Sequence, residues 1–104
     1  MAFDALEAAV KLAGQLRGPL VRLKGISREL ADQVERASIS VALNLGEGRG
    51  REGRDRVHFF RIAQGSAGEL KTALMLARAM GLADLDEVDM TLDRVCAMTW
   101  RLTH

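Results

Sequence analysis

The sequence predicts an all-α protein that folds as an antiparallel up-down-up-down four-helix bundle, in a single domain over residues 1–104. Three observations favour this class. Apolar residues recur at steps of three and four along most of the 104-residue chain, which is the period of amphipathic helices. Residues that favour strands are scarce, with no Tyr and three Phe. The breaks between the periodic stretches are short, as they are between antiparallel neighbouring helices.

The first expected helix is amphipathic and is interrupted by a glycine–proline pair. Its apolar residues are Phe3, Leu6, Val10, Ala13 and Leu16. Gly18 and Pro19 kink or end it, because proline lacks an N–H and its ring clashes with the preceding turn. Residues 20–23 carry three apolar side chains and can add a last turn.

The second expected helix is apolar on more than one side. Ser27 stands where its N-cap should be, and the helix runs to about Gly46 or Gly48. The stripe expected to face the core consists of Leu30, Val34, Ala37, Val41 and Leu45. A second apolar side carries Ile39, Ala42, Leu43 and Gly46. Because a helix that is apolar on two sides is usually buried on both, this helix should contact a partner outside its own bundle.

The last two expected helices carry the most regular patterns. Asp55 is the expected N-cap of the third helix, and Gly81 ends it. Its heptad seam consists of Phe59, Ala63, Ser66, Leu70, Ala73, Ala77 and Met80. Asp84 and Glu87 have the spacing of a capping box for the fourth helix. The stripe of the fourth helix consists of Leu85, Val88, Leu92, Val95, Thr99 and Leu102. Cys96, Met98 and Trp100 are interpreted as core and interface filling.

Composition and charge narrow the classes of function. Fifteen basic residues against fourteen acidic ones give a net charge of +1, so any attraction to nucleic acid or anionic lipid must be local. Cys96 is the lone cysteine; it cannot form an internal disulfide or make a metal site by itself, which suits a reducing cytosol. No apolar run approaches the roughly 20 residues of a membrane span. We therefore expect a cytoplasmic protein without cofactor, metal, membrane contact or small-molecule substrate.

A set of polar side chains follows the second and third expected helices. Its members are Arg36, Ser40, Asn44, Glu47, Ser66 and Glu69. Two carboxylates near an amide can perform acid–base chemistry. However, no His or Cys accompanies them, and a tight bundle lacks the open cleft that a glycosidase-like pair needs. The favoured interpretation is a buried hydrogen-bonded cluster that fixes the register of the two helices, with Arg36 as counter-charge.

An arginine-rich segment joins the same two helices. Its basic side chains are Arg49, Arg51, Arg54, Arg56, His58 and Arg61. Arginine suits phosphate because its planar guanidinium donates two hydrogen bonds at once and stays charged. In a symmetric oligomer, copies of this segment would form a ring of positive potential. The competing interpretation is a solvated loop. The glycines do not indicate a nucleotide-binding loop, because they lack its strand-then-helix context.

Two runs of sequence carry a resemblance to a known family. "RASISVALNLGEGRGR" and "FFRIAQGSAGELKTAL" resemble the four-helix bundle proteins encoded in intervening sequences of bacterial 23S ribosomal RNA genes. The accessory variability determinant of diversity-generating retroelements belongs to the same group. The matching positions are Arg36-Ala37, Ser40, Asn44, Glu47-Gly48, Gly50-Arg51, Ala63, Gly65-Ser66 and Glu69-Leu70. The sequence departs from the pattern in having Gly46 in place of Ala and Glu35 in place of the first of an Arg pair.

The resemblance implies a homo-oligomer, commonly a pentamer, without enzymatic activity. In the retroelement branch it also implies partnership with a reverse transcriptase and its RNA. We therefore expect a non-catalytic accessory protein that binds RNA, a reverse transcriptase or both through the arginine-rich segment. One alternative is a purely structural self-assembling module. Another is a small helical ribonuclease in which Arg51 and His58 supply acid–base chemistry.

Overall fold

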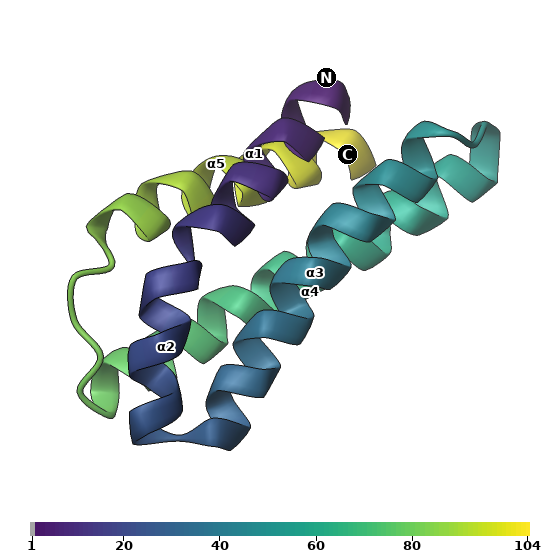
Figure 1. Ribbon diagram of the computed structural model, residues 1–104. Coiled ribbons are helices and arrows are strands. Elements are labelled where there is room, and N and C mark those ends of the chain that lie inside the picture. Colours follow the sequence, from purple (N-terminus) through teal and green to yellow (C-terminus); the bar gives the residue numbers. More distant parts are fainter. Residues whose placement is uncertain (1) are drawn as a thin grey trace.

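The protein is helical along the described part of the chain. The computed structural model describes residues 2–104, and residue 1 of the expected domain lies outside them. Five helices follow one another with short connections (Figure 1): α1 (Ala2–Gln15), α2 (Arg17–Ile26), α3 (Arg28–Arg49), α4 (Gly53–Ala79) and α5 (Asp86–Thr103). No strand occurs within residues 2–104. The all-α prediction is confirmed, and the number of helices is five where four were expected.

The additional helix arises from Pro19. Proline has no N–H, so the carbonyl of Gln15 has no partner four residues later, and the chain turns at Leu16. Helical bonding resumes at once, because the N–H of Leu20 donates to the carbonyl of Leu16 over 2.9 Å. The segment expected to add a last turn is therefore a separate helix, α2.

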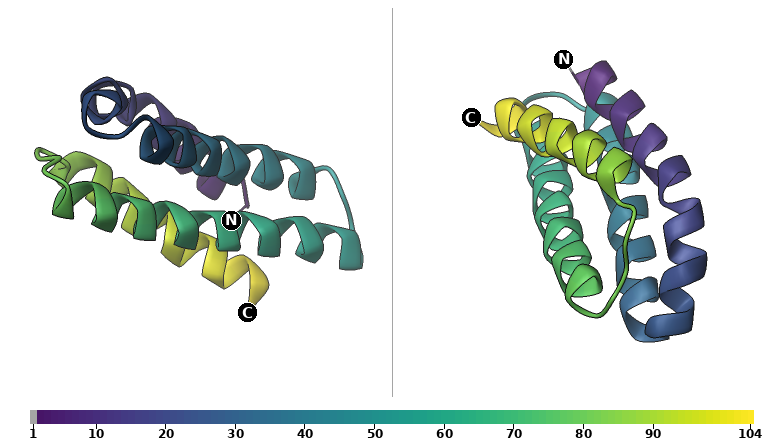
Figure 2. Two further views of the ribbon diagram at one scale, coloured as in Figure 1. Left: turned by 90° about the horizontal axis from the view of Figure 1, so that it is seen from below. Right: turned by 90° about the vertical axis from the view of Figure 1, so that its left-hand side faces the viewer.

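The helices lie in two layers. Figure 2 shows α1, α2 and α3 on one side and α4 with α5 on the other. α1 packs against α3 and α5, and α4 packs against α3 and α5. The hairpin of α3 and α4 is the longest unit, and the turn that joins these two helices projects past α1 and α5 (Figure 1). This arrangement places the arginine-rich segment at one end of an elongated molecule of 43 × 22 × 19 Å.

The stripes predicted for α3, α4 and α5 form most of the core. The stripe predicted for the first helix is wrong, because Phe3 and Val10 are 50% and 58% exposed and the buried side of α1 consists mainly of alanines and Leu12. The largest fully buried side chains are Leu12, Leu16, Leu23, Leu45, Leu70, Leu74, Leu92, Val34, Val41, Val95 and Thr99. In α4 the ends of the predicted seam also lie outside the core: Phe59 is half-buried and Met80 is exposed. Phe60, one residue later than expected, is the aromatic ring that enters the core. The core thus stops short of both ends of α4.

One predicted cap is confirmed and two are wrong. The hydroxyl oxygen of Ser27 accepts a hydrogen bond from the N–H of Leu30 over 3.1 Å, so Ser27 caps α3 as expected. Asp55 does not cap α4, because Gly53 takes a φ of +59° and the helix already begins there. The capping box also fails: Asp84 takes a φ of 61° and the cap falls one residue later, so Glu87 is out of register.

Gly81 ends α4 as expected. It adopts a φ of +110°, which side chains disfavour and glycine tolerates. The N–H of Leu82 donates to the carbonyl of Ala77 over 2.9 Å, and that of Gly81 donates to Arg78 over 3.0 Å. This pair of bonds is the Schellman motif, which satisfies carbonyls at a helix end.

Candidate nucleic-acid interface at the turn between α3 and α4

The turn between α3 and α4 is shaped by glycines. Gly48 lies at a close approach of the two helices, since a Cβ at this position would come within 2.6 Å of the Phe60 ring. The N–H of Gly50 donates to the carbonyl of Glu47 over 3.2 Å, which tightens the last turn of α3. Gly53 then reverses the chain with its positive φ. The arginines around these glycines are thereby held on a short, defined connection.

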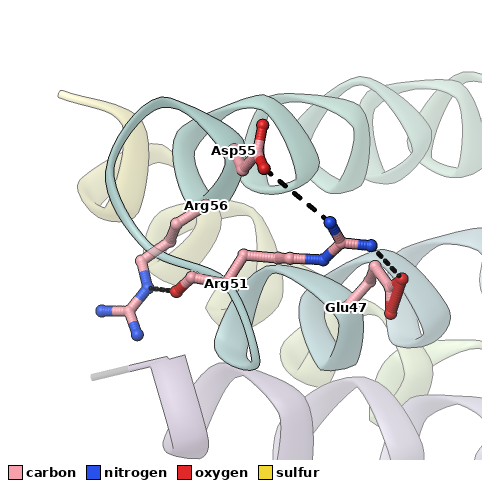
Figure 3. A network of polar contacts seen from close by, with 4 residues as sticks. All are labelled: Glu47, Arg51, Asp55 and Arg56. Carbon is pink, nitrogen blue, oxygen red and sulfur yellow. Dashed lines mark hydrogen bonds and ion pairs between the residues drawn. The ribbon is translucent and has the colours of Figure 1, made fainter.

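Arg51 is occupied by carboxylates. Its guanidinium lies 3.1 Å from Oε1 of Glu47 and 3.7 Å from Oδ2 of Asp55 (Figure 3). It also lies over the ring of Phe59, 5.3 Å from the ring centre. All four groups are partly open to solvent, and exposed ion pairs contribute only about 0–1 kcal/mol each. Arg51 thus joins the end of α3 to the start of α4 and has little capacity left for a ligand.

Arg56 and Arg49 are also used within the chain. Nε of Arg56 donates to the carbonyl of Arg51 over 2.8 Å (Figure 3), and its Nη2 donates to that of Arg49 over 3.3 Å. A cation at the C-terminal end of a helix is favourable, because the unpaired carbonyls carry partial negative charge. The guanidinium of Arg49 lies over the Phe3 ring, 4.8 Å from its centre, and so connects the turn to α1.

Arg54 and Arg61 are the arginines of this segment without partners. Both are exposed, and neither forms a hydrogen bond or an ion pair with any residue in the range 2–104. With Gly53 and Val57 they line one surface hollow on α4. His58 is exposed on the same helix and contacts the edge of the Phe59 ring, at a centroid distance of 5.3 Å. The free donors of the segment therefore lie on α4, beyond the turn.

The segment is locally basic despite the ion pairs. Residues 47–61 hold five arginines against three carboxylates, those of Glu47, Glu52 and Asp55. The sequence drew attention to this segment because it contains many arginines. It gave no indication that Arg51 and Arg56 would bond within the turn, that Arg49 would lie over Phe3, and that two arginines would stay free.

The polar cluster is smaller than expected. The hydroxyl oxygens of Ser40 and Ser66 lie 2.7 Å apart across the contact between α3 and α4. Nδ2 of Asn44 donates to the carbonyl of Ser40 over 2.8 Å and to its hydroxyl oxygen over 3.1 Å. The other three members are exposed and lie outside this network: Arg36, Glu47 and Glu69. The expected counter-charge, Arg36, is exposed and forms no hydrogen bond or ion pair within residues 2–104, and Glu47 bonds to Arg51.

Trp100 does not fill the core of the chain, and its expected role at an interface stays a prediction. Its side chain is 53% exposed, and its indole stacks on the imidazole of His104 with centroids 4.1 Å apart and an interplanar angle of 6°. The residues of α5 that fill the core lie on the opposite side of the helix. The helical period of α5 could have shown this, since Trp100 falls outside the predicted stripe.

Two classes of site find no support in the described residues. Within residues 2–104, no group of three or more His, Cys, Asp or Glu side chains is placed to hold a metal ion. No helix in the same range combines the length and apolar character that crossing a bilayer requires.

The fold and the turn define a small all-α protein whose longest hairpin ends in an arginine-rich connection. Comparison with known families matches residues 21–104 to the 23S rRNA-intervening sequence proteins. The chain belongs to this family. A comparison with curated proteins gives no match.

Proposed function

We propose that this protein is a non-catalytic, homo-oligomeric accessory protein that binds RNA through the arginine-rich segment between α3 and α4. The observation that supports this most is the state of Arg54 and Arg61, which are exposed on one face of α4 and have no partner among the described residues 2–104. Family membership adds a link to ribosomal RNA genes through the name of the family.

The contact with RNA is electrostatic. Arg54 and Arg61 lie seven residues apart, which is two helical turns or about 10 Å along α4. Guanidinium groups at this spacing can engage separate phosphates of one strand. Such contacts position a nucleic acid without reading its sequence, and they release counterions, so binding weakens steeply with salt.

Oligomerisation adds to the affinity for RNA, because several copies of the arginine-rich segment act together. Ile39 and Leu43 on the outer side of α3 are 49% and 68% exposed in the single chain, and Gly46 follows on the same side. Covering these side chains with a second copy would stabilise each contact by about 25 cal/mol per Å² of apolar surface. A closed ring, which we take to be a pentamer, then presents the arginine-rich segment once per chain.

A reverse transcriptase is the protein partner we infer for the case in which the chain acts in a retroelement.

The purely structural module is the second candidate, and one observation favours it. Arg49, Arg51 and Arg56 bond within the chain, so much of the segment's positive charge already serves the turn.

A filter-binding assay with a single-stranded oligoribonucleotide tests the proposal. The double substitution Arg54→Gln/Arg61→Gln should reduce RNA retention at low salt by at least tenfold. Arg28→Gln is the control, since Arg28 is exposed at the far end of α3. If the parent retains no RNA at low salt, the structural module replaces the RNA-binding proposal.

A further inference from the structure

The unpartnered arginines of α4 continue along the helix into a polar bridge to α5. Gln64 lies one turn after Arg61, so the two side chains are neighbours on the helix surface. The hydroxyl of Thr103 donates to Oε1 of Gln64 over 2.7 Å. This bond fixes the last turn of α5 beside the first half of α4, as the course of the chain in Figure 2 also shows.

An aromatic stack stands next to that bridge. The indole of Trp100 and the imidazole of His104 lie parallel, with centroids 4.1 Å apart. Nδ1 of His104 lies 2.9 Å from the carbonyl of Trp100 and 2.9 Å from the hydroxyl of Thr103, so the imidazole is held over the indole. The stack is thus positioned by the same threonine that bonds to α4.

We propose that Arg54, Arg61 and the Trp100–His104 stack form one site for single-stranded RNA, in which the arginines hold phosphates and an unpaired base stacks on the aromatic rings. This inference rests on the proposed RNA binding and specifies what the site recognises. Single-stranded nucleic acid is bound elsewhere by the same combination, a basic track beside aromatic side chains.

The geometry favours a single strand over a duplex. Arg61 lies one helical turn before Gln64, which bonds to α5 beside the stack, and packed helices lie about 8–10 Å apart. A short stretch of RNA would therefore reach from Arg61 to the stack. An unpaired base can leave its neighbours and lie against the rings. A base inside a duplex cannot, because its faces are already stacked and its edge is paired.

Trp100 is also the reporter for the test. It is the only tryptophan of the chain, which contains no tyrosine, so intrinsic fluorescence comes from this side chain. A base that stacks on the aromatic rings should quench its emission. The full chain is titrated with a single-stranded oligouridylate, with a duplex RNA of equal length and with inorganic polyphosphate, and binding is measured in parallel by filter retention.

The single strand should bind and quench, whereas the duplex and polyphosphate should bind without quenching. Trp100→Leu should weaken single-strand binding by roughly 5- to 100-fold, the range for loss of one stacked base. It should leave polyphosphate binding unchanged, and Trp100→Phe should retain most of the affinity. Met90→Leu is the control, since Met90 is 73% exposed elsewhere on α5. Circular dichroism verifies that each variant is folded.

The two proposals fail in different ways. RNA that binds the parent without changing Trp100 emission, or with equal affinity for Trp100→Leu, overturns the stacking site and leaves RNA binding intact. Equal quenching by duplex RNA overturns the preference for a single strand. Absence of any RNA binding at low salt overturns both the proposed function and this inference.

Discussion

Ser40 of α3 and Ser66 of α4 share a hydrogen bond of 2.7 Å between their hydroxyl oxygens, midway along the contact between the two longest helices. Asn44 donates to the same hydroxyl and to the carbonyl of Ser40, so one turn of α3 is bonded both to itself and to its neighbour. This bond fixes the register of the hairpin that carries the arginine-rich segment.

We predict that Ser66→Ala destabilises the fold by about 0.5–1.5 kcal/mol, because a neutral hydrogen bond of net value about 1 kcal/mol is lost from a buried position. Urea unfolding measures the change. In a double-mutant cycle, Ser40→Ala and Ser66→Ala should be non-additive, since they remove the same bond. Glu69→Ala, at an exposed position outside the network, should stay within about 0.5 kcal/mol of the parent. Strict additivity of the serine pair would show that the bond contributes nothing.

Gly48→Ala should be destabilising by about 1–3 kcal/mol. The added Cβ would lie 2.6 Å from the Phe60 ring and 3.1 Å from the carbonyl oxygen of Arg56, so α3 and α4 would have to separate. Gly14→Ala is the matched control, because nothing lies within 4 Å of its Cβ position. That change should stabilise α1 by up to about 1 kcal/mol. Thermal melts of the two variants measure the change in stability. Equal changes for Gly48→Ala and Gly14→Ala would mean that the close approach at Gly48 is not needed.

The apolar outer side of α3 should be the contact between chains. Leu43→Glu places a charge on a side chain that is 68% exposed in the monomer, so the fold should survive and the oligomer should dissociate. Val21→Glu is the control, at a 69% exposed position on α2. Native mass spectrometry should give a closed oligomer for the parent and the control, and monomers for Leu43→Glu. A monomeric parent at micromolar concentration contradicts the assembly.

Cys96 should react slowly with thiol reagents near neutral pH. Burial raises the pKa of its thiol by disfavouring the thiolate, whereas Lys71 lowers it and Asp93 raises it. The rate of alkylation in the native protein should therefore rise at higher pH than the rate in urea. Lys71→Met should shift the native profile further upward, since the cation that favours the thiolate is removed. Superimposable profiles for native and unfolded chains would contradict the burial of this thiol.

Most of the fold could be predicted from periodicity, because the apolar stripes of α3, α4 and α5 continue over several turns and each turn repeats the signal. The stripe expected for α1 was wrong, because its buried side consists mainly of alanines while the larger Phe3 and Val10 lie on the exposed side. The other errors lie where a single residue decides. Pro19 splits one expected helix into α1 and α2, since helical bonding resumes directly after the missing N–H. The cap of α5 falls at Leu85, one residue after the expected position, because Asp84 adopts a left-handed conformation.

The sequence could predict that the candidate site is rich in arginine, but it could not predict which arginines are free. A sequence shows that arginines are numerous around the glycines; it does not show which of them bond to nearby carbonyls and carboxylates. Arg51 and Arg56 are used in this way, whereas Arg54 points to no partner within residues 2–104. The sequence did not separate a core role from an interface role for Trp100, although the exposed position of this side chain follows from its place outside the core stripe.

The central claim is that RNA binds through Arg54 and Arg61, and the salt dependence of binding tests it most directly. The logarithm of the association constant for a single-stranded oligoribonucleotide is measured against the logarithm of the salt concentration for the parent, Arg54→Gln/Arg61→Gln and Arg28→Gln. Each phosphate contact that is lost should make the slope for a single strand less steep by about 0.7, so the double variant should lose about 1.4 if both contacts are made. Arg28→Gln should keep the parental slope. An unchanged slope for the double variant, with binding retained, would contradict the account.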